Sequence, residues 1–233
     1  MAARPDNLMA EPVSEDDTHA LAWYAQSRPL FTGSNQVRLL RGGDQLFPAM
    51  QEAIERARHR VWLATYIFHD DIAGQDMAAA LARAAQRGVR VSVVIDGFGS
   101  GPSLARIGPR LRDSGVRLTV FRPLAGWRSW LQPGQLRRLH QKLCVVDADV
   151  GFVGGINIID DRLDIHHGWS DWPRLDYAVE VRGPIVAPME QTVRALWMRS
   201  HLGRDWRDEL VELARSSYPM ARARRLLRRL RTT

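Results

Sequence analysis

A histidine and a lysine two positions apart are the residues of this sequence that most clearly indicate chemistry. They are His140 and Lys142, which open the segment HQKLCVVD at residues 140–147. Alternate residues of a strand face the same way, so these two side chains are expected to project together. A lysine ammonium neutralises phosphoryl oxygens, and a neutral imidazole attacks phosphorus or transfers a proton. The spacing therefore predicts a phosphate site.

Lys142 is the only lysine in the chain, although Lys and Arg together number 33. Codon bias accounts for abundant arginine, but it does not account for the position of the one lysine. An ammonium is a compact point charge, whereas a guanidinium is a planar fork. The single lysine therefore strengthens the interpretation of residues 140–147 as a phosphate site.

A second polar segment follows the first after six residues, as Gly154-Gly155-Ile156-Asn157. Gly155 lacks a side chain, which lets backbone approach a ligand closely. The Asn157 amide can donate hydrogen bonds to a phosphoryl oxygen. We expect both residues to complete the phosphate site.

The composition limits the classes of protein that this chain can belong to. It has 233 residues, a formal charge of +7 and one cysteine, Cys144, which excludes an internal disulfide and a multi-cysteine zinc site. With 45% hydrophobic and 25% charged residues, the chain has an ordinary globular composition. No apolar run reaches the roughly 18–20 residues of a membrane-spanning helix, and the first residues lack a signal-peptide core. We expect a protein that is not secreted and that binds an anionic partner.

Alternating helix and strand patterns predict an α/β fold. Helices are expected at residues 14–28, 44–58, 75–86, 104–114 and 184–203, and strands at 36–40, 60–68, 89–96, 116–121, 139–146, 150–159 and 175–181. Residues 122–138 and 160–174 are expected to be loops. The predicted organisation is a helical extension at residues 1–29, one domain at 30–204, and an Arg-rich helical tail or linker at 205–233.

The whole pattern, H-x-K-x4-D followed by G-G-x-N, resembles the signature of the phospholipase D superfamily. Further stretches are similar to the N-terminal half of bacterial cardiolipin synthases, most of all to the shorter type without N-terminal transmembrane helices. These stretches are YIFHDD at 66–71, RGVRVSVVIDGFGS at 87–100, GFVGGINIIDD at 151–161 and EVRGPIV at 180–186. The resemblance implies a mixed, mostly parallel sheet with helices on both faces.

The resemblance also implies a mechanism without a metal or cofactor. A histidine attacks the phosphodiester to form a phosphohistidine, and a second histidine protonates the leaving alcohol and activates the incoming one. His140 would be nucleophile or acid/base, Lys142, Asn157 and Gly155 would bind phosphate, and Asp147 would support the catalytic motif. A carboxylate behind the histidine would orient its ring, with Asp176 the first choice and Glu180 the second.

The sequence departs from this family in carrying one motif where cardiolipin synthases carry two, because no second lysine exists. Either the chain is part of a longer enzyme, which the Arg-rich end favours, or it pairs with a second copy. The leading hypothesis is a cardiolipin synthase-type phosphatidyltransferase that acts on phosphatidylglycerol. The alternatives are a homodimeric nuclease or phosphodiesterase, and a half without catalysis that binds lipid or assists folding.

Tryptophans in the expected loop at 122–138 bear on the choice of partner. Trp127 and Trp130 lie among arginines, which favours contact with a membrane interface. His166 and His167 supply too few ligands for a metal and are expected near the mouth of the site. The expected partners are therefore anionic phospholipid and a membrane surface, at the cytoplasmic face of a bacterial inner membrane, rather than nucleic acid.

Overall fold

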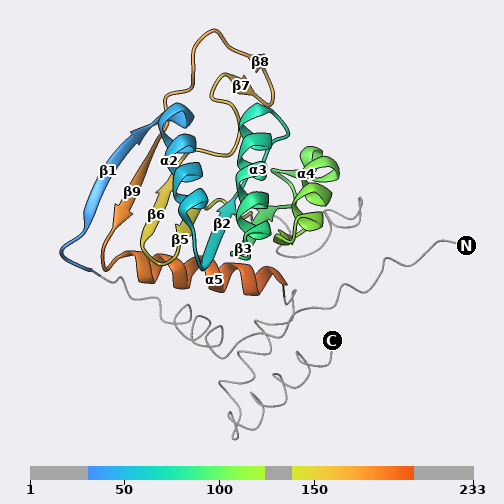
Figure 1. The fold of residues 1–233 in the computed structure, drawn as a ribbon. Coiled ribbons are helices and arrows are strands. Elements are labelled where there is room, and N and C mark those ends of the chain that lie inside the picture. The colour runs from blue at the N-terminus through green and yellow to red at the C-terminus, as the bar shows by residue number, and fades with distance from the viewer. Residues whose placement is uncertain (1–30, 124–137, 202–233) are drawn as a thin grey trace, which may run out of the picture.

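The computed structural model describes residues 31–123 and 138–201. The expected helix at 14–28, the tryptophan-bearing loop at 127–131, the Arg-rich tail and the boundaries of the central domain lie outside these residues. Within them, the chain forms four helices around one large sheet (Figure 1). The helices are α2 (Gly42–Arg56), α3 (Ile72–Gln86), α4 (Gly101–Asp113) and α5 (Val186–His201).

The sheet has seven strands in the order β1-β9-β6-β5-β2-β3-β4. Their bounds are β1 Gln36–Arg41, β2 Arg60–Thr65, β3 Arg90–Asp96, β4 Arg117–Phe121, β5 Leu143–Val146, β6 Val150–Gly154 and β9 Tyr177–Arg182. Two short strands, β7 (Leu163–Asp164) and β8 (Gly168–Trp169), form a separate hairpin within the expected loop at 160–174. The expected α/β class is confirmed.

The sheet is mixed as expected, but the expectation that it is mostly parallel is wrong. Only β2–β3 and β3–β4 are parallel, while β1–β9, β2–β5, β5–β6 and β6–β9 are antiparallel. The parallel pairs belong to the stretch in which α3 and α4 cross between strands. β5 and β6 are joined by the tight turn at residues 147–149, and a direct hairpin forces its strands to run antiparallel.

Helices cover both faces of the sheet, as expected. On one face, α2, α3 and α4 bury apolar residues such as Ile54, Met77 and Leu111 against the sheet. On the other face, α5 packs against β2, β4 and β5 and forms a second cluster that contains Trp62 and Trp197. The Glu190 carboxylate in this cluster accepts a hydrogen bond from Trp62 Nε1 (3.2 Å) and pairs with Arg60 Nε (2.9 Å).

Three strands next to the predicted site are shorter than their apolar patterns suggest. The expected strands 60–68 and 150–159 end at Thr65 and Gly154, and the expected strand 139–146 begins at Leu143. Past these points the two chain segments meet in a single parallel bridge, Phe68 with Ile158. The apolar residues beyond the strands are buried by that connection, so hydrophobicity alone did not mark where the sheet ends.

Candidate active site

His140 and Lys142 lie immediately before β5, at the end of the sheet where β2 and β3 finish. We call this the site end, and the opposite end of the same strands the far end. The carboxyl ends of parallel strands are a common place for ligands because loops leave the sheet there. Lys142 Nζ is 3.2 Å from His140 Nε2 and 3.3 Å from the His140 carbonyl oxygen. The two side chains project together, although both precede the strand.

The two partners differ in their exposure. His140 is exposed, whereas Lys142 is only 9% exposed. An ammonium that donates to Nε2 requires the imidazole lone pair on that nitrogen and its proton on Nδ1. The contact therefore matches a neutral His140 whose Nε2 lone pair faces the lysine.

Lys142 lines a small cavity whose other walls are mostly apolar. They include Phe47, Met50, Cys144, Phe152 and Ala178. Burial lowers the pKa of Lys142, and the negative charge of Asp176 opposes that shift. Burial also raises the pKa of the Cys144 thiol to about 12, so that thiol stays protonated.

Asp176 reaches the site end beside Gly155. A Cβ added to Gly155 would lie 2.2 Å from Asp176 Oδ1, so only glycine leaves room for this carboxylate. Oδ1 accepts the Tyr177 N–H at 2.8 Å. Within residues 31–123 and 138–201, no hydrogen bond joins Asp176 to His140. The structure thus places Asp176 where its charge acts on Lys142.

Gly155 and Asn157 follow β6 at the site end, and both have backbone partners. The Gly155 N–H donates to Tyr177 O at 3.0 Å, so the space it opens is used by Asp176. Asn157 Oδ1 accepts the Ile67 N–H at 3.1 Å. Its Nδ2 group has no hydrogen bond to another residue that the structure describes, so this donor is the one left for a ligand.

Tyr66 is a site residue that residue-by-residue reasoning missed. Its ring centroid lies 5.4 Å from that of His140, and Lys142 Nζ lies 5.6 Å from it. Burial raises the pKa of Tyr66, the charge of Asp96 adds to that shift, and Arg138 opposes it. The available signal was an aromatic residue directly after a buried strand, in the stretch YIFHDD.

Asp96, at the end of β3, is a second residue that was missed. Its side chain is fully buried, and Oδ2 accepts the Leu139 N–H at 2.8 Å, one residue before His140. Oδ1 accepts the N–H groups of Phe98 (2.8 Å) and Gly99 (3.0 Å). Gly99 in turn packs under the Tyr66 ring. Asp96 therefore fixes the chain that carries His140 and the loop that supports Tyr66.

Asp147, the last residue of the predicted motif, lies at the far end and not beside His140. Its carboxylate accepts three backbone N–H groups, from Arg58 (2.7 Å), His59 (2.9 Å) and Arg60 (2.7 Å). Burial acts to raise the pKa of Asp147, but these hydrogen bonds outweigh it and the pKa is lowered. Asp147 therefore joins the β5–β6 turn to the start of β2.

The remaining predicted residues lie in β9 and in the β7–β8 hairpin. Glu180 stands opposite Phe152 in the sheet register, where Arg38 Nε donates to it at 3.0 Å. His166 and His167 are exposed between β7 and β8, beyond the site end. Of the two carboxylates proposed at the site, the structure brings in Asp176 and leaves Glu180 in the sheet.

Comparison with known proteins decides the family. The family described as "Cardiolipin synthase, PLD-like domain" matches residues 50–167. Cardiolipin synthase B of Salmonella typhi is 36% identical over 180 residues, which cover 72% of this chain and 42% of that protein. The chain belongs to the cardiolipin synthase family of phospholipase D-like domains. Cardiolipin synthase A of Pseudomonas putida strain GB-1 is 37% identical, over 73% of this chain and 35% of its own length.

Solved structures show the same fold in this phospholipase D-like domain. The phosphatidylserine synthase of Haemophilus influenzae matches with a TM-score of 0.54 at 17% identity, over 79% of this chain and 42% of that one. The phospholipase D family member Nuc of Salmonella typhimurium matches with a TM-score of 0.52 at 18% identity, over 70% and 95%. The chain spans less than half the length of the curated cardiolipin synthases it matches.

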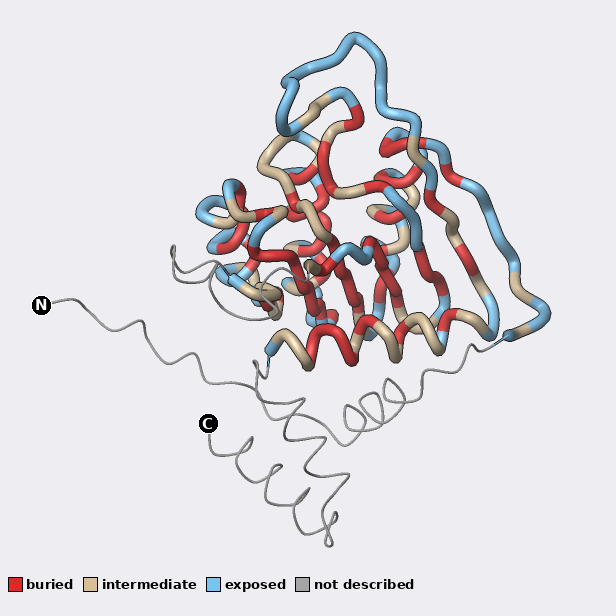
Figure 2. Tube along the Cα trace, turned by 180° about the vertical axis from the view of Figure 1, so that it is seen from behind, coloured by how far each residue is buried: buried red, intermediate tan, exposed pale blue. Residues whose placement is uncertain are grey.

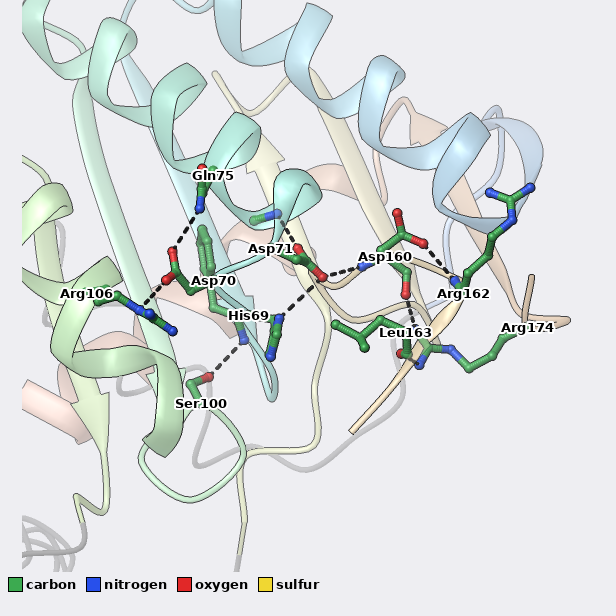
Figure 3. A network of polar contacts seen from close by, with 12 residues as sticks. His69, Asp70, Asp71, Gln75, Ser100, Arg106, Asp160, Arg162, Leu163 and Arg174 are labelled. Atoms are coloured by element: carbon green, nitrogen blue, oxygen red, sulfur yellow. Dashed lines mark hydrogen bonds and ion pairs between the residues drawn. The ribbon is translucent and has the colours of Figure 1, made fainter. Parts of the chain in front are cut away.

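A network of polar contacts braces the site end of this cardiolipin synthase-like domain (Figure 3). Asp71 Oδ1 accepts the N–H of Gly74 at the start of α3, and Oδ2 accepts that of Asp160 at 2.8 Å. His69 Nδ1 lies 3.4 Å from Asp71 Oδ2, and the neighbouring Asp70 pairs with Arg106 of α4. The contact between Asp71 and Asp160 therefore joins the segments that follow β2 and β6.

Proposed function

We propose that this chain supplies one half of a cardiolipin-forming phosphatidyltransferase. In the reaction, one phosphatidylglycerol gives up its phosphatidyl group, a second one accepts it, and glycerol is released. The observation that carries this proposal is the contact between His140 and Lys142 beside Tyr66, in a domain of the cardiolipin synthase family. A nucleophile or base next to a desolvated cation is what transfer of a phosphodiester requires.

The contact between His140 and Lys142 suggests how the first step proceeds. An incoming phosphodiester presents two oxygens that compete with His140 Nε2 for the Lys142 ammonium. When Lys142 turns to a phosphoryl oxygen, the Nε2 lone pair is free to attack phosphorus, the bond from phosphorus to the glycerol oxygen breaks, and that oxygen takes up a proton. The attack leaves a phosphatidyl-histidine.

Asn157 and Asp176 support the same step from the strands beside β5. The unpaired Nδ2 of Asn157 would donate to a phosphoryl oxygen, while Asp176 favours the charged form of Lys142. In the second step, a base removes the proton from the acceptor hydroxyl, which attacks phosphorus and restores neutral His140. Over the two steps, one proton is taken up by the leaving glycerol and one is released by the acceptor hydroxyl, so no net proton is gained or lost.

A second histidine is required to protonate the leaving glycerol and to activate the acceptor. The chain has no second lysine, so it has no second H-x-K motif of its own. We propose that a second phospholipase D-like half completes the site, supplied by the continuation of the chain or by a second copy. His140 is exposed, which leaves room for such a half to reach it.

The place of action follows from the substrate. Phosphatidylglycerol lies in a bilayer, and among the described residues no helix is long and apolar enough to cross one. We propose that the protein works from the surface of the inner membrane, on its cytoplasmic face.

The test uses the complete gene product that contains this chain, purified and given phosphatidylglycerol vesicles or plasmid DNA. We expect cardiolipin and glycerol from the vesicles, intact DNA, and a loss of about 10⁴-fold or more in His140→Ala. His59→Ala is the matched control, because His59 is an exposed histidine at the far end. Cleaved DNA with unchanged lipid, or undiminished cardiolipin synthesis by His140→Ala, would overturn the proposal.

A further inference from the structure

An exposed aromatic segment stands beyond the site end. It comprises residues 163–175, which contain β7 and β8 and lead into β9; we call it the aromatic segment. Four of its apolar side chains are exposed, to 46% for Ile165, 65% for Trp169, 80% for Trp172 and 71% for Leu175. Figure 2 shows its chain as a pale-blue arc, exposed along most of its length. Large apolar side chains gathered on a protruding segment mark an interaction surface.

The aromatic segment is held in a defined conformation. Arg174 donates to the carbonyl oxygens of Leu163 (2.7 Å) and Asp160 (3.1 Å), across the base of the segment (Figure 3). Ser170 N donates to Arg162 O at 2.8 Å, and Asp164 Oδ1 accepts the N–H groups of His166 and His167. Hydrogen bonds within residues 160–174 therefore hold the segment that carries Trp169 and Trp172.

The position of the segment connects it to the site. The chain that carries it leaves the sheet where β6 ends at Gly154 and rejoins it where β9 begins at Tyr177, and both points lie at the site end beside the start of β5. Figure 1 places β7 and β8 beyond the site end and away from α5. The segment therefore extends from the same end of the sheet that carries His140 and Lys142.

The chemistry of the segment favours a lipid interface over a protein partner. Charged residues are interspersed with the tryptophans, as in the stretch WSDWPR at 169–174. The buried centre of a protein interface is depleted of charge, whereas a headgroup layer accepts aromatic rings next to charged groups. We propose that the aromatic segment inserts Trp169 and Trp172 into the headgroup boundary of a bilayer and so sets the site end against the membrane. This inference rests on the proposed function in that the substrate is a bilayer lipid.

The charge of the segment predicts how the binding responds to salt. Its residues 163–175 contain Asp164 and Asp171 against Arg174, so they do not attract anionic headgroups. Insertion is then driven by apolar area, which salt does not screen. The contribution of the segment is expected to be the same at low and high salt and to differ little between neutral and anionic vesicles.

The test measures sedimentation of the purified complete gene product with phosphatidylcholine vesicles that contain phosphatidylglycerol, at low and high salt. We expect the double variant Trp169→Ala/Trp172→Ala to bind at least about tenfold more weakly at both salt concentrations. The control Val37→Ala/Leu39→Ala removes side chains of similar exposure (65% and 63%) on β1 and is expected to bind like the wild type. Equal binding by the tryptophan variant and the wild type would overturn the inference.

Two further measurements separate this inference from the proposed function. Monomeric short-chain phosphatidylglycerol needs no bilayer, so the tryptophan variant is expected to turn it over at the wild-type rate and to lose activity only on vesicles. If the wild type turns over neither substrate but still needs the tryptophans to bind vesicles, the proposed function fails and the inference stands. A change in the mass of the protein in solution, with vesicle binding unchanged, would assign the segment to a protein contact and overturn the inference.

Discussion

The polar residues at the two ends of β5 differ in whether their surroundings favour the charged form. At the site end, Lys142 is buried and lines a mostly apolar cavity, and burial lowers its pKa. At the far end, Asp147 accepts three backbone N–H groups, and its pKa is lowered because they favour the carboxylate. The first arrangement holds a charge where it is costly, and the second holds one where it is stabilised. One short sequence motif therefore combines a buried lysine paired with a histidine at one end with a structural carboxylate at the other.

Different physical requirements explain the contrast. A phosphate site needs a cation that is poorly solvated, so that a phosphoryl oxygen competes well for it. The start of β2 needs an acceptor for the N–H groups of residues 58–60, which the sheet does not satisfy. The motif H-x-K-x4-D spans the strand because each of these needs arises at one of its ends.

The largest effect that tests this contrast is expected from Lys142→Met. The variant should lose activity by about 10²–10³-fold, because it removes a charge that stabilises the transition state. Its free energy of unfolding should stay the same or rise by about 1 kcal/mol, because methionine avoids the cost of a buried ammonium. Chemical denaturation and turnover of phosphatidylglycerol measure the two quantities. A strongly destabilised variant would show that Lys142 supports the fold.

The next largest effect is expected from Asp147→Ala, which should lower stability and leave activity unchanged, the reverse of Lys142→Met. Its free energy of unfolding should fall by about 2 kcal/mol, because three N–H groups lose their acceptor. Turnover per folded molecule should remain close to that of the wild type. Asp149→Ala is the control, since Asp149 lies in the same turn and its side chain makes an exposed ion pair with Arg182, worth under about 1 kcal/mol. Full stability combined with lost turnover in Asp147→Ala would give the far end a direct part in catalysis.

The pH dependence of stability follows from the same carboxylate. Its pKa is lower in the folded protein than its ordinary value of 3.8. The stabilisation is therefore complete above pH 3.8 and is lost as the pH falls through the lowered value. Acid unfolding of the wild type and of Asp147→Asn should converge at low pH. Curves that stay equally separated however far the pH falls below 3.8 would contradict this assignment.

The smallest effect concerns the turn that carries Asp147. Ala148 has a φ of +56°, in the left-handed region that glycine adopts more easily. Ala148→Gly should raise the free energy of unfolding by about 0.5–1 kcal/mol and leave turnover unchanged. Thermal unfolding measures the change. A destabilised variant would mean that the turn is not strained at this residue.

The sequence predicted that the His140 and Lys142 side chains lie together, because the signal is local. The spacing of His140 and Lys142 needed only the alternation of an extended chain, and the glycine at 155 marked a close approach. The approach turned out to be that of Asp176, because β9 pairs with β6 and brings this carboxylate over the glycine. The periodicity of the sequence does not show that β6 and β9 pair, so this contact could not be predicted from it.

The residues that were missed or misplaced depend on strand order. Asp147 meets residues 58–60 because β5 runs antiparallel beside β2, whereas the β-α-β pattern suggested a mostly parallel sheet. Asp96 reaches Leu139 because β3 ends next to the segment that enters β5. Tyr66 joins His140 for the same reason. Single-residue chemistry does not encode which strands lie side by side, so these contacts needed the structure.

The most direct test of the central claim is cardiolipin formation in a bacterial strain without cardiolipin synthases of its own. The complete gene product is expressed as wild type, His140→Ala or His59→Ala, and the lipids are extracted and measured by mass spectrometry. Our account predicts cardiolipin from the wild type and from His59→Ala, and none from His140→Ala. Cardiolipin at the wild-type amount from His140→Ala, or its absence with the wild type, would contradict the account.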